Sequence, residues 1–552
     1  MPKLCQGIIL SPILLAFAVL LSADARGMNR DNVNILYWIR FEDKGISEPV
    51  RLSDRALERR GLRTAIHGFT WFDIPVNENY IDELRNEGVS IRNRSRWLNA
   101  VSAELNEETL KRIKNLPFIK DIARVSSYSR PLPLPAVEIG ITAPAISAFD
   151  YGPSFTQINL INVDSLHNLG FFGNGVLIGV LDTGFDTSHA VFSDIRFDGR
   201  ILAAYDFING DSNVVDGQDA QRTHGTQVLS ALGGFAEGSL VGSAFGAEFI
   251  LAKTEIVSQE IQAEEDNWVA AIEWMESLGV EIVSSSLGYI DWYDTSQVDG
   301  QTALVTQAAN IAVSLGVVVV NAAGNEGNTS WRTVIPPADG DSVIAVGAVS
   351  SNGEIVTFSS RGPTADGRIK PDFCALGSSV YLANWYGGYG FSGGTSFAAP
   401  LVAGGIALLI ESHPTWTIAR HFDVLKLASS NRHLPNNTYG WGIPNFAAAN
   451  YGQPGLSPFA VSPVLIAPHP AIDSVIFYLD LAPSGTGELS IHDLSGTMVD
   501  KISLRNDGGG IMTYIWNGEN SHGRRVGSGI YICQFISGGR EAVEKFFFVA
   551  NF

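Results

Sequence analysis

The sequence predicts an α/β protein built around a doubly wound, mainly parallel sheet. Short apolar runs alternate with helical patterns at 268–278 and 303–315, and these runs lie at 176–180, 249–251, 282–283, 317–320 and 343–346. Runs that are apolar on both sides indicate strands covered on both faces, and strands alternating with helices build parallel sheets. The pattern changes at both ends of the chain. Residues 30–128 predict a small α+β domain, and residues 459–552 predict a β-sandwich.

The composition is that of a multidomain protein with ordinary packed cores. The chain has 552 residues, 45% of them hydrophobic, and a formal net charge of −20. This charge repels phosphate backbones and anionic membrane surfaces, so nucleic acid is not an expected partner. Beyond Cys5 only Cys374 and Cys533 occur, in different predicted domains. We expect two buried free thiols rather than a disulfide, with stability supplied by core burial.

The first 25 residues have the pattern of a cleaved signal peptide. A basic start precedes the apolar stretch 8–21, which ends at the sequence Ala23-Asp24-Ala25. The alternative is a membrane anchor, but the stretch contains Ser11 and Pro12 and is shorter than the roughly 20 residues that a span needs. The expected location is therefore outside the cell or at its surface.

Residues 30–128 mix strand and helix patterns. Residues 35–39 predict a strand, Ser53 is placed to cap a helix over 53–60, and Asn106 is placed to cap another over 107–114. The proline-rich sequence at 131–135 then predicts an extended linker. We assign 129–154 to this linker and to the start of the segment that follows it, and 155–450 to the domain with the parallel sheet.

Three polar residues of this domain are of the types that nucleophilic catalysis by a serine requires. Ser396 stands in the run Gly-Gly-Thr-Ser-Phe-Ala-Ala-Pro, Asp182 directly follows the strand at 176–180, and His224 lies in Thr-His-Gly-Thr. A serine needs a base, histidine titrates near neutrality, and a carboxylate fixes the histidine tautomer. Functional groups gather at the carboxyl ends of parallel strands. Each fragment taken singly could be an ordinary turn.

A fourth fragment, Asn325 in Ala-Ala-Gly-Asn-Glu-Gly, follows the strand at 317–320 and supplies an uncharged donor for an oxyanion. With all four fragments in the order Asp, His, Asn, Ser, residues 155–450 resemble the subtilisin-like serine peptidases. The resemblance implies that Ser396 is the nucleophile, His224 the general base and acid, and Asp182 its orienting carboxylate. Asn325 and the backbone N–H of Ser396 would then bind the oxyanion. Where the family often has a second histidine, this chain has Gln227.

The resemblance also implies a role for the domain at 30–128. A compact domain ahead of a subtilisin-like domain resembles the family's propeptide, which assists folding and inhibits the enzyme until it is cut away. A cut between Ser129 and Tyr151 is expected. The alternative is a permanently attached accessory domain.

Two further segments resemble the walls of the family's P1 pocket. They are Ser286-Leu287-Gly288 and Ala322-Ala323-Gly324. Small residues there favour an open apolar slot that accepts a medium or large apolar P1 side chain. The plain alternative is a pair of tight turns at strand ends.

No cofactor is needed for this chemistry, and no metal ligand is assigned. The family commonly binds structural calcium, and the acidic stretch 211–219 offers oxygen atoms. It has no fixed-spacing loop motif, however, so a solvated acidic surface is the favoured interpretation.

Residues 459–552 show short alternating strand patterns separated by turns, which favours a small β-sandwich. The segments 489–496, 516–518 and 528–531 resemble the C-terminal sorting or Ig-like modules of secreted bacterial enzymes. Ala-Pro-His-Pro at 467–470 replaces the usual Pro-Asn-Pro opening. Both a contact with secretion machinery and a plain accessory role therefore stay open.

The sequence thus predicts a secreted serine endopeptidase made as a zymogen, with protein or peptide substrates and its own propeptide as inhibitor. A catalytically silent binding protein would be expected to have lost one of the four residues, and all four are present. A lipase or esterase of the α/β-hydrolase type is excluded by the order Asp, His, Ser and by the missing Gly-x-Ser-x-Gly.

Overall fold

The computed structural model describes residues 35–125 except 65, residues 149–450 except 216–218 and 258–260, and residues 464–550 with gaps at 468–470, 473, 483–484, 494 and 507–509. The expected signal peptide (1–25) lies outside the described residues. So do most of the linker at 129–154 and the stretch that joins the last two domains. The contacts divide the chain into two units.

The first unit contains an antiparallel four-stranded sheet in the order β2-β3-β1-β4. Its strands are β1 (Ile35–Phe41), β2 (Ser90–Ser95), β3 (Ala100–Leu105) and β4 (Ile119–Arg124), with helices α3 (Glu78–Asn86) and α4 (Glu107–Ile113). The expected cap of α4 is confirmed, because the Asn106 side chain accepts a hydrogen bond from the Thr109 N–H at 2.9 Å. Ile39, Ile81 and Val101 lie in one shared core.

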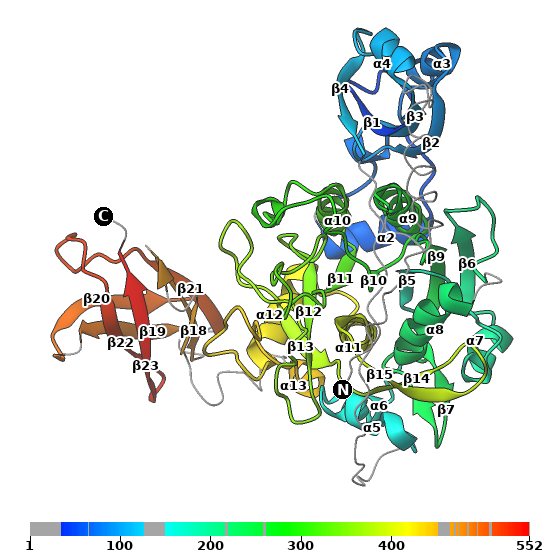
Figure 1. Ribbon diagram of the computed structural model, residues 1–552. Coiled ribbons are helices and arrows are strands. Elements are labelled where there is room, and N and C mark those ends of the chain that lie inside the picture. The colour runs from blue at the N-terminus through cyan, green and yellow to red at the C-terminus, as the bar shows by residue number, and fades with distance from the viewer. Residues whose placement is uncertain are drawn as a thin grey trace, which may run out of the picture. The chain divides into compact units, whose positions relative to one another are not determined.

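The second unit is built on a seven-stranded sheet in the order β13-β12-β11-β10-β5-β9-β6, which confirms the predicted doubly wound fold (Figure 1). Every paired neighbour in it is parallel. The strands are β5 (Leu177–Asp182), β6 (Ile201–Asp206), β9 (Glu248–Lys253), β10 (Ile282–Ser285), β11 (Val318–Ala322), β12 (Ile344–Val349) and β13 (Phe373–Leu376).

Helices cover both faces of this sheet. Helices α8 (Asp219–Gly233) and α11 (Thr395–Ser412) lie on one face, and α9 (Ala263–Leu278) and α10 (Leu304–Ser314) lie on the other. Along β5, Ile178 and Val180 join the first core while Leu177 and Leu181 join the second. This alternation explains why the strand is apolar throughout. Among the described residues, α11 is the one helix apolar and long enough to cross a membrane, and 89% of it is buried inside the protein.

Shorter elements complete this part of the chain. They are α5 (Phe155–Asn159), α6 (Val163–Asn168), α7 (Ser193–Phe197), β7 (Phe235–Ala236), β8 (Leu240–Val241), β14 (Val380–Ala383), β15 (Tyr389–Ser392), α12 (Ile418–Ala428) and α13 (Phe446–Asn450).

Part of the expected N-terminal domain belongs to the second unit. Residues Glu48–Ile74, with helix α2 (Asp54–Arg63), and residues Ser95–Leu98 group with the parallel sheet rather than with β1–β4. The expected cap of α2 is present, since the Ser53 hydroxyl accepts from the Ala56 N–H at 3.1 Å. The sequence gives no hint of this division, because the packing joins segments about 200 residues apart.

The C-terminal strands form two sheets around one apolar core, as a β-sandwich requires. One sheet has the order β16-β18-β21 and the other β17-β23-β22-β19-β20. The strands are β16 (Val464–Ala467), β17 (Ala471–Ile472), β18 (Val475–Leu481), β19 (Thr486–Asp493), β20 (Met498–Arg505), β21 (Gly510–Trp516), β22 (Gly529–Ser537) and β23 (Arg540–Val549). Cys374 and Cys533 are buried free thiols, as expected.

Candidate active site

The four predicted catalytic residues lie on elements that meet at the carboxyl edge of the parallel sheet. Asp182 is the last residue of β5, and Asn325 stands in the loop after β11. Ser396 is the second residue of α11, and His224 lies in α8. The chain leaves β5 for β6 on one side of the sheet and returns to β10 on the other. A reversal of strand order opens the crevice in which such sheets place their sites.

Asp182 and His224 are joined by a hydrogen bond of 2.7 Å between Oδ1 and Nδ1. Because a carboxylate only accepts, Nδ1 carries the proton and Nε2 is left as the basic atom. Asp182 is fully buried, whereas the His224 side chain is 30% exposed. Burial alone would lower the pKa of His224, but the charge of Asp182 and the hydrogen bond to it raise the pKa above its ordinary value.

A glycine lets the helix that carries His224 approach β5. A Cβ atom on Gly225 would lie 2.2 Å from the carbonyl oxygen of Gly184 and 3.1 Å from the side chain of Asp182. A larger residue would therefore push α8 away from the strand end. The contact between Asp182 and His224 therefore requires a glycine at position 225.

Ser396 lies where the first turn of α11 leaves backbone N–H groups without helical partners. The Thr395 N–H donates to Asn325 and the Phe397 N–H to Gly394, and the structure gives the Ser396 N–H no acceptor within the described ranges. The Phe397 ring lies 5.6 Å from the His224 ring, centroid to centroid. The residue that follows Ser396 therefore lies against the ring of His224.

The side chains of His224 and Ser396 are not hydrogen-bonded to each other in the described structure. Instead the Ser396 hydroxyl donates weakly to the carbonyl oxygen of Ser286 at 3.4 Å. The Ser286 hydroxyl in turn donates to the carbonyl oxygen of Ser396 at 2.7 Å. Catalytic hydrogen bonds are often long or misaligned until substrate binds, so this arrangement agrees with a resting site.

Asn325 is held in one orientation by Thr395. Its Oδ1 accepts from the Thr395 N–H at 3.0 Å and from the Thr395 hydroxyl at 3.1 Å. Because a backbone N–H is only a donor, the atom facing it must be the amide oxygen. The Nδ2 group therefore points the other way, and it has no hydrogen-bond acceptor among the residues that the structure describes. Thr395 has a positioning role that the sequence analysis missed, although it directly precedes Ser396.

The two expected pocket walls follow the neighbouring strands β10 and β11, and the side chain of Ile335 lies against a glycine of each wall. A Cβ atom on Gly288 would lie 2.2 Å from Ile335 Cδ1, and one on Gly324 would lie 2.8 Å from Ile335 Cγ2. The backbone holds this residue between the walls, since the Ile335 N–H donates to Ala323 at 3.1 Å and Pro336 accepts from the Tyr289 N–H at 3.1 Å. Ile335, which lies outside both walls, therefore narrows the space between the two glycines, and the open slot stays a prediction.

The remaining wall residues also lie at this edge of the sheet. Ser286 contacts Ser396, and the carbonyl oxygen of Leu287 accepts from the side chain of Asn321 at 2.9 Å. Ala322 ends β11, and Ala323 and Gly324 follow it. Gln227, which replaces the family's second histidine, donates to the side chain of Asn384 at 3.3 Å and takes no part in the Asp182 contacts.

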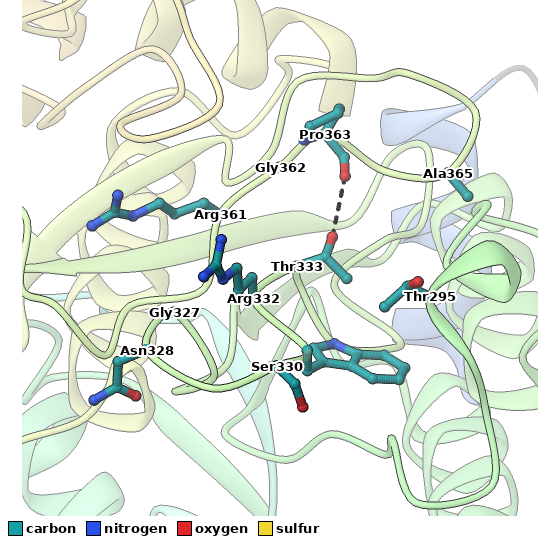
Figure 2. Close-up of a pocket in the computed structure, with 11 residues that line it drawn as sticks. Thr295, Gly327, Asn328, Ser330, Arg332, Thr333, Arg361, Gly362, Pro363 and Ala365 are labelled. Carbon is teal, nitrogen blue, oxygen red and sulfur yellow. Dashed lines mark hydrogen bonds between the residues drawn. The ribbon is translucent and has the colours of Figure 1, made fainter.

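A separate cavity of about 680 Å³ lies beyond the Asn325 loop and is shown in Figure 2. Gly327, Arg332, Thr333 and Arg361 are among its lining residues, and none of the four predicted catalytic residues lines it. No group of three or more His, Cys, Asp or Glu side chains in the described residues is arranged to hold a metal ion. Residues 216–218 of the acidic stretch 211–219 lie outside the described residues.

Comparison with known proteins gives matches over two parts of the chain. Residues 173–442 match the family described as the Subtilase family. Residues 36–134 match the Peptidase S8 propeptide domain of Bacteroidota.

Individual relatives cover most of their own length. Subtilisin E from Bacillus subtilis (strain 168) is 31% identical over 374 residues, which is 67% of this chain and 85% of that protein. A subtilisin from Bacillus pumilus is 34% identical over 295 residues, 53% of this chain and 97% of its own. An alkaline protease from Alkalihalobacillus alcalophilus is 28% identical over 358 residues, 63% of this chain and 84% of its own.

Proposed function

This chain belongs to the subtilase family and is a subtilisin-like serine peptidase, and we propose that it is a secreted endopeptidase made as a zymogen. The observation that carries the proposal is the 2.7 Å hydrogen bond between His224 and the buried carboxylate of Asp182. The ring of His224 also lies against the ring of Phe397, the residue after Ser396. The match of residues 36–134 to a propeptide domain supports synthesis as a precursor. The apolar N-terminal stretch supports export.

In the proposed first step the Ser396 Oγ attacks the carbonyl carbon of the scissile peptide bond. His224 Nε2 takes the hydroxyl proton as the bond forms, and Asp182 stabilises the resulting imidazolium. The negative charge moves to the carbonyl oxygen. The Asn325 Nδ2 and the Ser396 N–H donate to that oxygen, and one such donor is worth roughly 10²–10³ in kcat.

The tetrahedral intermediate then collapses. The carbon–nitrogen bond breaks, His224 gives its proton to the leaving amine, and an ester to Ser396 is left. Water attacks this ester with His224 again as base, and the acid product leaves with the serine restored. Every proton is carried by a residue of the chain, and no step requires a metal ion or cofactor.

We also propose that the enzyme accepts small P1 side chains, such as those of alanine, glycine and serine. Ile335 fills the space between Gly288 and Gly324 into which a larger side chain would extend. The Ile335 N–H donates to Ala323 and the Pro336 carbonyl oxygen accepts from Tyr289, so the backbone keeps Ile335 between the two walls. A pocket rejects one extra methylene by about 10–200-fold, and leucine or phenylalanine exceeds alanine by several carbons.

A fluorophosphonate probe tests the catalytic assignment. The processed protein is expected to be labelled at Ser396 and to hydrolyse casein, whereas Ser396→Ala should show neither reaction. Ser314→Ala, which changes an exposed serine of α10, is the control and should keep labelling. Labelling of the Ser396→Ala protein, or none of the processed parent, contradicts the assignment.

A peptide library varied at P1 tests the specificity. The parent should cleave best after alanine or glycine, and Ile335→Ala should raise the leucine-to-alanine ratio of kcat/KM by about 100-fold. Ile443→Ala removes the same atoms far from the two walls and should leave the ratio unchanged. A parent that prefers phenylalanine or leucine rejects the proposal, while casein hydrolysis would still support the enzyme assignment.

A further inference from the structure

The cavity of about 680 Å³ beyond the Asn325 loop carries positive charge, although the whole chain has a formal net charge of −20. Arg332 and Arg361 both line it, as Figure 2 shows, and none of the described residues in its lining is an aspartate or a glutamate. The other polar side chains of the lining are neutral, and they belong to Thr295, Asn328, Ser330 and Thr333. The cavity therefore offers hydrogen-bond donors and two positive charges to an anionic group.

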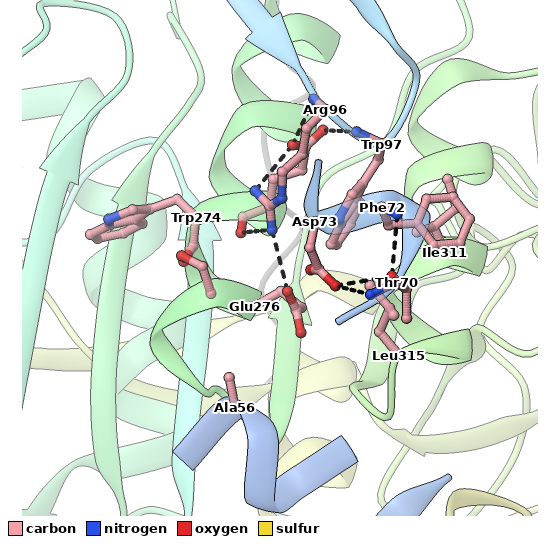
Figure 3. A network of polar contacts seen from close by, with 12 residues as sticks. Ala56, Thr70, Phe72, Asp73, Arg96, Trp97, Trp274, Glu276, Ile311 and Leu315 are labelled. Carbon is pink, nitrogen blue, oxygen red and sulfur yellow. Dashed lines mark hydrogen bonds and ion pairs between the residues drawn. The ribbon is translucent and has the colours of Figure 1, made fainter. Parts of the chain in front are cut away.

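Neither of these two guanidinium groups has a partner in the described part of the chain. No salt bridge or side-chain hydrogen bond joins Arg332 or Arg361 to another described residue, and the Nε atom of Arg361 is buried without an acceptor. By contrast, the guanidinium of Arg96 is paired with the carboxylate of Glu276 at 3.3 Å, within the network of Figure 3. A buried donor that is left unpaired is costly, so folded proteins keep one mainly where a ligand or a water completes it.

The backbone holds the two arginines on neighbouring segments. Thr333 and Arg361 form a parallel β-bridge, and the Arg361 N–H donates to the carbonyl oxygen of Arg332 at 3.0 Å. The Thr333 hydroxyl donates to the carbonyl oxygen of Pro363 at 3.1 Å, which is the dashed bond in Figure 2. Like charges on adjacent strands repel each other. An anion bound by both guanidinium groups would remove that repulsion.

Arg332 has a backbone conformation that residues with a Cβ atom rarely adopt. Its φ angle is +61°, in the left-handed region. Its N–H donates at 3.2 Å to the carbonyl oxygen of Glu326, the residue after Asn325, and this bond closes the loop. Conformations of this kind cost free energy and are concentrated at sites with a function. The strained residue is one of the two that supply the positive charge of the cavity.

The size and the walls of the cavity indicate the class of ligand. Its volume is about 680 Å³. Pockets of about 300–1,000 Å³ hold whole small ligands, so a single carboxylate or phosphate would fill only a small part of this one. The indole N–H of Trp331 donates to the carbonyl oxygen of Val334 at 3.3 Å, so the ring itself provides an apolar wall. Arginine binds carboxylates through two parallel hydrogen bonds. A peptide segment with an acidic side chain supplies both the carboxylate and an apolar remainder.

The cavity begins close to the predicted oxyanion donor. Gly327 lines the cavity and stands two residues after Asn325, so their Cα atoms lie within about 7 Å of each other. The Gly327 N–H donates to the carbonyl oxygen of Phe358 at 2.8 Å, which fixes this part of the loop. A polypeptide that reaches the catalytic residues can therefore place a neighbouring part of its chain in the cavity.

We propose that this cavity is an accessory binding site for an acidic polypeptide segment, whose aspartate or glutamate side chain pairs with Arg332 and Arg361. In a peptidase this segment belongs to the protein substrate, and its binding lowers KM without changing the chemistry at Ser396. The role in substrate binding rests on the proposed function. The binding of the acidic segment does not.

The first test uses the full chain with Ser396→Ala, so that hydrolysis plays no part. A short fluorescein-labelled peptide rich in glutamate is titrated with this protein, and its anisotropy is compared with that of the same peptide carrying glutamine instead. The acidic peptide should bind at least about 10-fold more tightly, because its carboxylates form charge-assisted hydrogen bonds. Equal affinity for the two peptides, or binding of inorganic phosphate without any preference for the acidic peptide, would overturn the proposal.

Variants of the two arginines assign this binding to the cavity. Arg332→Gln and Arg361→Gln should each weaken binding of the acidic peptide by about 10-fold or more. The side chain of Arg332 is exposed, so its variant keeps the test decisive even if the Arg361 variant does not fold. Arg524→Gln is the matched control, because it removes an exposed arginine between β21 and β22 that does not line the cavity, and the affinity should not change. An unchanged affinity in Arg332→Gln would overturn the proposal.

Kinetics of the active parent separate this proposal from the proposed function. A peptide substrate with a glutamate-rich flank should have a lower KM than its glutamine counterpart and the same kcat, and Arg332→Gln should remove the difference. Hydrolysis of both substrates with equal KM would overturn the role in substrate binding. Failure to hydrolyse either substrate would contradict the peptidase assignment, while the anisotropy result would still decide whether the cavity binds acidic segments.

Discussion

Replacing Asp182 by asparagine removes the charge beside His224 while keeping the shape of the side chain. In the parent, Oδ1 accepts from the Thr183 N–H at 2.7 Å as well as from His224. The asparagine oxygen should keep that place, since a flipped amide would set its NH₂ group against the backbone N–H. His224 then keeps its proton on Nδ1 and loses only the stabilisation of its charged form.

The expected loss follows from the pKa of His224. An opposite charge at this range raises a pKa by about 1–3 units, and each unit is worth a factor of 10. The plateau of kcat/KM should therefore fall by about 10–10³. A site in which the histidine takes the wrong tautomer loses roughly 10⁴. The free energy of unfolding of the variant should also fall by about 1–3 kcal/mol. The Oδ2 atom of Asp182 is buried without a described partner, and in asparagine its place is taken by an NH₂ group that finds no acceptor.

The assay is kcat/KM against pH on a fluorogenic peptide. The base must be neutral, so activity rises as pH increases through the His224 pKa. The parent's acid limb should have its midpoint above the ordinary value of about 6.5, because that pKa is raised. In Asp182→Asn, burial acts alone and the midpoint should fall below that value. Asp186→Asn, which has no bond to His224, is the control. An unmoved midpoint, or a loss of 10⁴ or more, refutes the reasoning.

Three further predictions follow from contacts at and near the site. Asn325→Ala should lower kcat by roughly 10²–10³ with little change in KM, as steady-state kinetics on a peptide ester would show; an equal effect on both constants would contradict an oxyanion role. Gly225→Ala should lower both activity and the melting temperature, since its Cβ would clash with a backbone oxygen at 2.2 Å, and calorimetry of folded protein can detect the change. Burial raises the pKa of Cys374 to about 12, so a thiol reagent at pH 8 should leave Cys374 and Cys533 unlabelled until denaturant is added, and fast labelling of native protein would contradict their burial.

Local patterns predicted most of the secondary structure and the candidate site. The caps at Ser53 and Asn106 were readable because a capping side chain acts on the backbone three residues away. The apolar run before Asp182 predicted a strand covered on both faces, as found in β5. The positions of Asp182 and Asn325 after strands were enough to place them at one edge of a parallel sheet.

Contacts between distant segments were not readable. The motifs predicted two pocket walls but not Ile335, whose backbone is hydrogen-bonded to Ala323. The composition of residues 30–128 suggested one domain, whereas Arg60 packs its charge against Glu276, 216 residues away. No periodicity or motif encodes such a pairing, because each partner looks like an ordinary surface charge in its own segment.

The kind of fold and the residue types available for acyl transfer could both be predicted from the amino-acid sequence. Both depend on short-range order: strand and helix periodicity, caps, and the residues that follow strands. The direction in which the Asn325 amide faces, the position of Ile335 between Gly288 and Gly324, and the partners of the arginines of α2 became visible in the folded chain alone. These features depend on which side chains the fold brings within a few ångströms of each other, and that distance is a property of the packed chain.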